Sequence, residues 1–94
     1  MIRHVSVLTF AEDITPGQIA AIEDALRTLP GRLPVQSYSL GPDLGIDAGN
    51  GSFAVVAEFA TQADYETYRD DPEHRRILSE LIRPHLASRA AAQF

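Results

Sequence analysis

Apolar and polar residues alternate along the first segment of the chain, Ile2–Phe10. Successive side chains of a β-strand point to opposite faces, so every second residue shares a face. One face of this segment carries Ile2, His4, Ser6, Leu8 and Phe10, and the other carries Arg3, Val5, Val7 and Thr9. Because isoleucine and valine are frequent in strands, the pattern predicts a β-strand over the whole segment.

The spacing of apolar residues then changes to that of a helix. Thr15 can cap a helix, Pro16 suits its first position, and Gln18 completes a capping box. The apolar residues that follow lie three or four apart, as on one face of a helix, and are Ile19, Ile22, Leu26 and Leu29. Pro30-Gly31 is expected to end this helix.

The rest of the chain predicts three more strands and a broken helix. Residues 35–41 and 52–60 have the composition of strands, and the segment 42–51, rich in glycine, proline and aspartate, predicts a loop. A short helix through Arg69 is followed by Asp71-Pro72-Glu73, which begins another helix that Pro84 ends. Residues 86–94 are predicted to form the last strand, although their alanines also fit a helix.

The predicted order β-α-β-β-α-β is that of a ferredoxin-like α+β fold, and residues 1–94 are expected to form one domain. Its four-stranded antiparallel sheet has helices on one face only. The other face is also apolar, because it carries Val5, Val7, Ala54 and Val56. We therefore expect a homodimer that packs sheet face against sheet face. Glu58 lies on this face and is expected to pair with an arginine across the interface.

The composition excludes several kinds of chemistry. The chain has no cysteine, which excludes disulfides, thiolate nucleophiles and zinc-thiolate sites. All eight basic residues are arginine, so a lysine Schiff base is impossible. A net charge of −5 disfavours a nucleic-acid partner. No apolar run approaches the ~20 residues of a membrane span, and the N-terminus lacks a signal-peptide pattern, so we expect no membrane association and a cytoplasmic location.

Neither a metal nor an organic cofactor is predicted. The three histidines, His4, His74 and His85, have no spacing typical of metal ligands. The glycines form no phosphate-binding loop. Any catalysis is therefore expected to depend on histidine, tyrosine, carboxylate or hydroxyl groups.

Four segments resemble the stress-responsive α/β-barrel (Dabb) family, namely residues 1–10, 15–18, 41–45 and 68–74. The resemblance extends over essentially the whole chain, and its most specific parts are the first-strand histidine and the Pro-x-His motif at Pro72–His74. It implies a dimeric α/β barrel. A plant polyketide cyclase of this family closes a poly-β-ketone by aldol condensation without a cofactor. Its site residues correspond here to His4, Tyr68 and His74.

The resemblance further implies a pocket between the helices and the inner sheet face, lined by Ser6, Leu8, Phe53 and Val55. At this site His74 would remove a proton next to a carbonyl, Tyr68 would donate to the enolate oxygen, and His4 would orient or protonate a second carbonyl. This hypothesis describes an aldol-type cyclase, a lyase or an isomerase. Ser6 and Phe53 depart from the cyclase, which has a bulky aliphatic and a polar residue there.

Two alternatives belong to other functional classes. One is a non-catalytic stress-responsive dimer that binds a small hydrophobic ligand, with His4 and Tyr68 as structural residues of the core. An open cavity around His4 would favour a ligand, and a closely packed one would favour a structural role. The other is a cofactor-independent monooxygenase, which turnover with oxygen consumption would identify.

Overall fold

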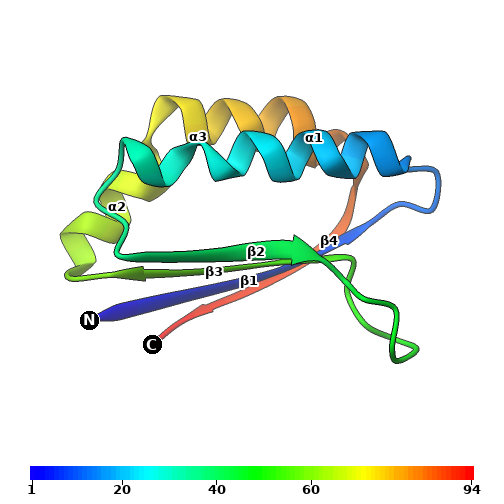
Figure 1. Cartoon of the computed structure of the whole chain (residues 1–94), viewed down its shortest axis with the longest axis horizontal. Helices are drawn as coiled ribbons and strands as arrows, with labels where there is room; N and C mark the ends of the chain where they lie inside the picture. Colours follow the sequence, from blue (N-terminus) through cyan, green and yellow to red (C-terminus); the bar gives the residue numbers. More distant parts are fainter.

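Four antiparallel strands form one sheet in the order β2-β3-β1-β4. The structure is a computed structural model that describes all residues, 1–94. The strands are β1 (Ile2–Phe10), β2 (Ser37–Pro42), β3 (Phe53–Phe59) and β4 (Leu86–Gln93). All helices cover one face of this sheet (Figure 1). The predicted ferredoxin-like order of strands and helices is confirmed.

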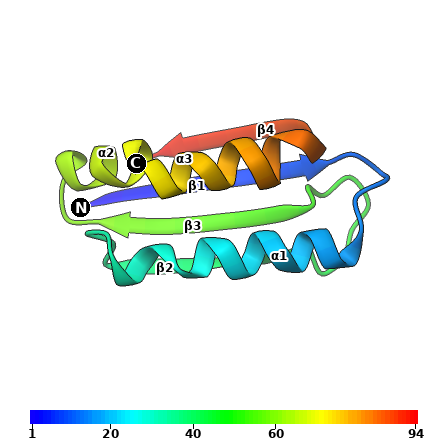
Figure 2. The same ribbon diagram turned by 90° about the horizontal axis from the view of Figure 1, so that it is seen from above.

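The first helix, α1 (Pro16–Arg27), begins with the predicted capping box. Thr15 Oγ1 accepts a hydrogen bond from the Gln18 backbone at 3.2 Å, and Gln18 Oε1 accepts one from the Thr15 backbone at 2.9 Å. These bonds satisfy two amides that the start of a helix leaves free. Viewed from above, α1 lies along the β2 side of the sheet (Figure 2).

The second helical region is broken between α2 (Gln62–Asp70) and α3 (Pro72–Ile77). Asp71 has extended backbone angles, φ −56° and ψ 130°, because a residue before proline is disfavoured in the helical region. Its carboxylate accepts a hydrogen bond from the His74 amide at 2.9 Å and so caps α3. The helical path continues through a π-helical turn (Leu78–Ile82) and a 3-10 turn (Arg83–His85) to β4, and it lies over β1 and alongside β4 (Figure 2).

The observed strand ends differ slightly from the predicted ones. The strand predicted at 35–41 begins at Ser37, because the Val35 amide is already bound to the nearby Leu33 carbonyl, at 2.8 Å. The strand β2 extends to Pro42. Proline has no amide hydrogen, and an edge strand tolerates this because only one of its sides is paired. The segment predicted as strand or helix at 86–94 is a strand, and it pairs with β1.

The inner sheet face and the helices enclose the core. The alternation in β1 is confirmed, because His4, Ser6, Leu8 and Phe10 are all buried on this face. Residues from every layer fill the core, and the largest fully buried ones are Phe53, Phe59, Ile22, Leu26, Leu29 and Ile77. No helix has the length and apolar character needed to cross a membrane.

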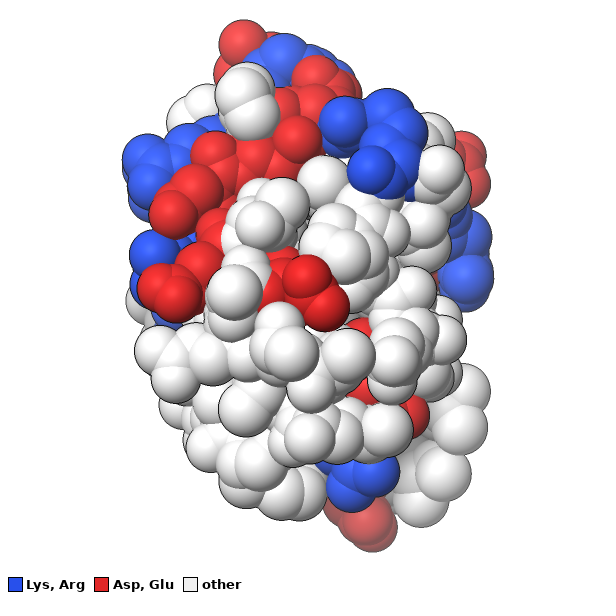
Figure 3. Space-filling model, turned by 90° about the vertical axis from the view of Figure 1, so that its left-hand side faces the viewer, with Lys and Arg blue, Asp and Glu red and all other residues white.

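The outer sheet face carries small apolar side chains from three strands. Val5 is paired with Val56 on one side and with Ala92 on the other, and Val7 is paired in the same way with Ala54 and Ala90. At one end of the molecule, charged side chains gather over the helical layer, and the surface toward the sheet is largely uncharged (Figure 3). No helix of the chain covers this outer face (Figure 1).

The expectation for Glu58 is wrong. Its carboxylate pairs with Arg3 of the neighbouring strand in the same chain, at 2.9 Å. The register of β1 and β3 places the two residues directly opposite each other, so no partner from another chain is required.

Candidate active site

A cavity of about 760 Å³ lies between the second helical region and the inner face of the sheet near β4. Six of the seven residues predicted for the site line it, namely His4, Ser6, Leu8, Val55, Tyr68 and His74. Phe53 is the exception. It is buried in the core against Phe10, with 6.3 Å between the ring centres, and does not line the cavity.

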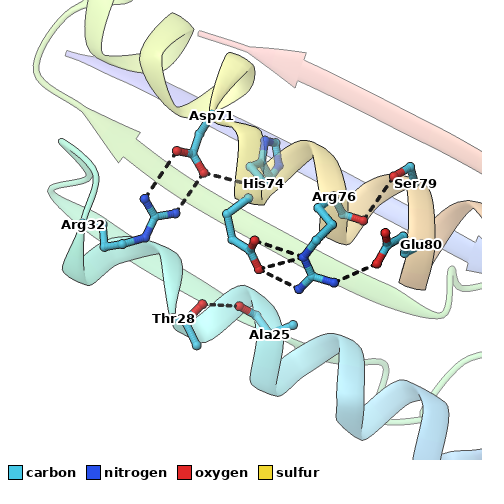
Figure 4. A network of polar contacts seen from close by, with 9 residues as sticks. Ala25, Thr28, Arg32, Asp71, His74, Arg76, Ser79 and Glu80 are labelled. Atoms are coloured by element: carbon cyan, nitrogen blue, oxygen red, sulfur yellow. Dashed lines mark hydrogen bonds and ion pairs between the residues drawn. The ribbon is translucent and has the colours of Figure 1, made fainter.

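His74 is held by the break before α3. Its amide is bound by Asp71, and Asp71 also forms an ion pair with Arg32 at 2.9 Å (Figure 4). The ring is nearly buried, and its Nδ1 lies 3.2 Å from the Arg69 carbonyl oxygen. Because a carbonyl only accepts hydrogen bonds, Nδ1 carries the proton of the neutral ring, and Nε2 is left with a free lone pair.

Burial is the main cause that lowers the pKa of His74. The contact with the Arg69 carbonyl opposes this effect, since it favours the protonated ring. Desolvation of the buried ring outweighs this opposing effect, so the pKa lies below its ordinary value. The result is a neutral imidazole whose Nε2 can accept a proton.

His4 is held in the opposite tautomer. Gln93 at the end of β4 donates from Nε2 to His4 Nδ1 at 2.8 Å, and the same amide group lies 3.5 Å from the Tyr65 hydroxyl. Since Nδ1 accepts, the proton of the neutral ring is on Nε2. Burial, and after it the positive charge of Arg89, lower the pKa of His4. His4 is therefore a hydrogen-bond donor at neutral pH.

Tyr68 connects the two histidines through a row of aromatic rings. It stacks on His74 with 4.3 Å between the ring centres and also contacts Phe59 at 5.3 Å. Phe59 contacts Tyr65, which in turn packs against His4 at 5.2 Å. The Tyr68 hydroxyl is 2.8 Å from that of Tyr38. Burial raises the pKa of Tyr68, so the phenol keeps its proton at neutral pH.

One cavity is therefore lined by His74, whose Nε2 has a free lone pair, by His4, whose Nε2 carries a proton, and by Tyr68, which keeps its phenolic proton. No three histidine or carboxylate side chains converge as metal ligands would. Sequence reasoning missed Tyr38, Tyr65 and Gln93. The separation of Tyr65 and Tyr68 by three residues places both on one helix face, and this signal could have identified Tyr65.

Lowering the pH from about 7.5 to about 5.5 is expected to destabilise the fold. His4 and His74 have a folded-state pKa below the ordinary value of 6.5, so the unfolded chain binds more protons in this range. Stability is therefore lost as the pH falls through 6.5 toward the lower folded-state values. Urea unfolding at the two pH values measures the effect. His74→Asn should reduce the pH dependence, and an equal dependence in this variant would contradict the assignment.

The chain matches the family model described as the stress responsive A/B barrel domain over residues 2–94. It is 39% identical to a dimeric ferredoxin-like protein of unknown function from Thermobifida fusca, with 99% of this chain and 88% of that chain covered and a TM-score of 0.91. No curated protein matches the sequence significantly.

Two more distant solved structures share the fold. One is a Dabb family protein with a ferredoxin-like fold from Mesorhizobium loti, at 22% identity and a TM-score of 0.79, covering 99% of this chain and 93% of that chain. The other is a hydroxynitrile lyase from Passiflora edulis, at 19% identity and a TM-score of 0.83, covering 99% of this chain and 90% of that chain.

Proposed function

Because the chain belongs to the stress-responsive α/β-barrel (Dabb) family, we propose that its cavity is the active site of a cofactor-free enzyme that acts on a carbonyl compound by acid–base catalysis. The observation that carries this proposal is the pair of buried neutral histidines, held in opposite tautomers at one cavity. A reaction that moves a proton from carbon to oxygen needs one acceptor and one donor at the same time.

In the proposed step, His74 Nε2 removes a proton from the carbon next to a carbonyl. The electron pair of the broken C–H bond moves into the enolate, and its oxygen receives a hydrogen bond from Tyr68. Tyr38 can donate to the Tyr68 oxygen, which leaves the Tyr68 proton free for the substrate. In an aldol closure the enolate carbon then attacks a second carbonyl, whose oxygen is stabilised by a hydrogen bond from His4 Nε2–H. The alkoxide that forms takes up the proton that His74 removed from carbon, so His74 returns to its neutral form and His4 remains neutral.

Two features support an enzyme over a structural dimer. The cavity has a volume of about 760 Å³, within the range of small-molecule sites, and is not filled by side chains around His4. A protein of the same fold is a hydroxynitrile lyase. The proposal therefore includes cyclase, lyase and isomerase reactions of carbonyl compounds. A non-catalytic binding protein would bind the same compounds without turnover, and a monooxygenase would consume oxygen during turnover.

Tyr68→Phe is expected to slow turnover by about tenfold to a hundredfold and to leave the fold intact, because it removes one hydroxyl and keeps the buried ring. Linear diketones and cyanohydrins, followed by NMR with and without oxygen, provide the assay. Thr67→Val is the control, since it removes an exposed hydroxyl of α2 outside the cavity lining and should leave turnover unchanged. Turnover by Tyr68→Phe at the rate of the parent would contradict the role of this hydroxyl.

We further propose a homodimer that buries the outer sheet face. The relative from Thermobifida fusca is described as dimeric. In this chain the outer face carries valines and alanines from three strands, and no helix covers it. Two such faces packed together would exclude water from these residues and form the dimeric barrel that the family resemblance implies.

A further inference from the structure

Arginine is the only charged residue type in the lining of the cavity. Five arginines contribute to it and no aspartate or glutamate does, although the chain has a net charge of −5. They are Arg69, Arg75, Arg76, Arg83 and Arg89. A cavity with this lining attracts anions, and its charge is opposite in sign to that of the whole chain.

Three of the five arginines have carboxylate partners outside the cavity. Arg69 and Arg75 pair with Asp70, and Arg76 pairs with both Glu73 and Glu80 (Figure 4 shows the Arg76 contacts). The three arginines outside the cavity are also paired. Arg83 and Arg89 are the two arginines of the chain that form no ion pair, and both line the cavity.

The fold places these two arginines at one side of the cavity. Arg89 lies opposite Leu8 in the register of β4 and β1, so it shares the inner face of the sheet with the cavity residues. Arg83 lies in the 3-10 turn that leads from the second helical region into β4. Ala91, two residues beyond Arg89, has a small side chain and keeps the inner face between Arg89 and Gln93 open. The charge of Arg89 also contributes to the low pKa of His4 and His74.

We propose that the cavity binds a substrate with an oxyanion group, a carboxylate or a phosphate, through Arg83 and Arg89. A guanidinium presents several donors in one plane and binds either group with paired, charge-assisted hydrogen bonds. This inference rests on the proposed function, which assigns the other end of the substrate: the carbonyl group that reaches His74 and Tyr68. It narrows the substrate class from carbonyl compounds in general to anionic ones.

Binding of three matched probes by isothermal calorimetry tests the inference without any turnover. The probes are naphthoate, naphthyl phosphate and the neutral methyl ester of naphthoate. At least one of the two anions should bind at a ratio of one per chain and at least about tenfold more tightly than the ester, and the tighter anion identifies the group. The double variant R83Q/R89Q should remove this difference and leave the affinity for the ester unchanged.

Arg27→Gln is the control variant, because Arg27 is an exposed arginine of α1 outside the cavity lining. It should bind all three probes as the parent does. Equal affinity for anions and ester in the parent would overturn the inference, as would no binding of any probe or an unchanged preference in R83Q/R89Q. His74→Asn should keep the preference for anions. If the chain prefers anions but turns over no carbonyl compound, the proposed function is refuted and the inference about anion binding stands.

Discussion

Replacement of His74 by asparagine is expected to lower the turnover of a carbonyl substrate by about 10²- to 10⁴-fold, the usual contribution of a positioned general base. The asparagine amide can take the place of Nδ1 and donate to the Arg69 carbonyl, so the local structure is retained. What the variant loses is Nε2, the atom that accepts the proton. The loss should appear in kcat more than in KM, because the interaction is made in the transition state.

His85→Asn is the matched control for this substitution. His85 lies in the 3-10 turn before β4 and does not line the cavity, so its replacement should leave turnover unchanged. Circular dichroism and thermal unfolding of both variants separate catalysis from folding. Turnover by a folded His74→Asn variant within about threefold of the parent would show that another group is the base.

Replacement of Val7 and Val56 together by glutamate is expected to convert the dimer into a monomer. Both side chains lie on the outer sheet face, where a second copy would bury two unpaired carboxylates per chain. Val7 is 36% exposed in the isolated chain, so one protomer alone tolerates a charge there. Sedimentation velocity at micromolar concentration should give a dimer for the parent and a monomer for the variant.

Because Gly51 packs closely against the Val7 side chain, glutamate at position 7 would also disturb this local contact. A second variant, placed away from Gly51, therefore tests the interface independently. Ala92→Glu places one carboxylate on the same face, two strands away from Val56. It should also weaken the dimer, whereas Ala20→Glu, on the exposed side of α1, should not. A monomeric parent, or a glutamate variant that sediments as the parent dimer does, would refute the proposed interface.

The elements with strong local signals could be predicted from the sequence. The alternation in β1 placed His4 on the inner face, and the Asp71-Pro72 break placed His74 at the start of a helix. Both signals depend on neighbouring residues only, through the period of a strand and the backbone restriction before proline. The family resemblance is confirmed by the match over residues 2–94, and it added the prediction that Tyr68 belongs to the same site.

The contacts that set the chemistry of the site could not be predicted in this way. Gln93 fixes the tautomer of His4 across 89 positions of sequence, and Tyr38 on the edge strand β2 reaches Tyr68 on α2. The alanines of β4 carry too little pattern to show which residues face inward, so Arg89 and Gln93 were missed. The family resemblance placed Phe53 in the pocket, but its ring is buried in the core and packs against Phe10.

Deuterium exchange measures directly whether His74 accepts a proton from carbon in this cavity. Small ketones such as levulinate and benzylacetone, incubated in heavy water with the protein, would be followed by proton NMR at the carbon next to the carbonyl. We expect the parent chain to accelerate exchange above the buffer rate for at least one of these ketones, and His74→Asn to reduce this acceleration by about a hundredfold or more. Exchange at the buffer rate with the parent, or equal acceleration by His74→Asn, would contradict this expectation.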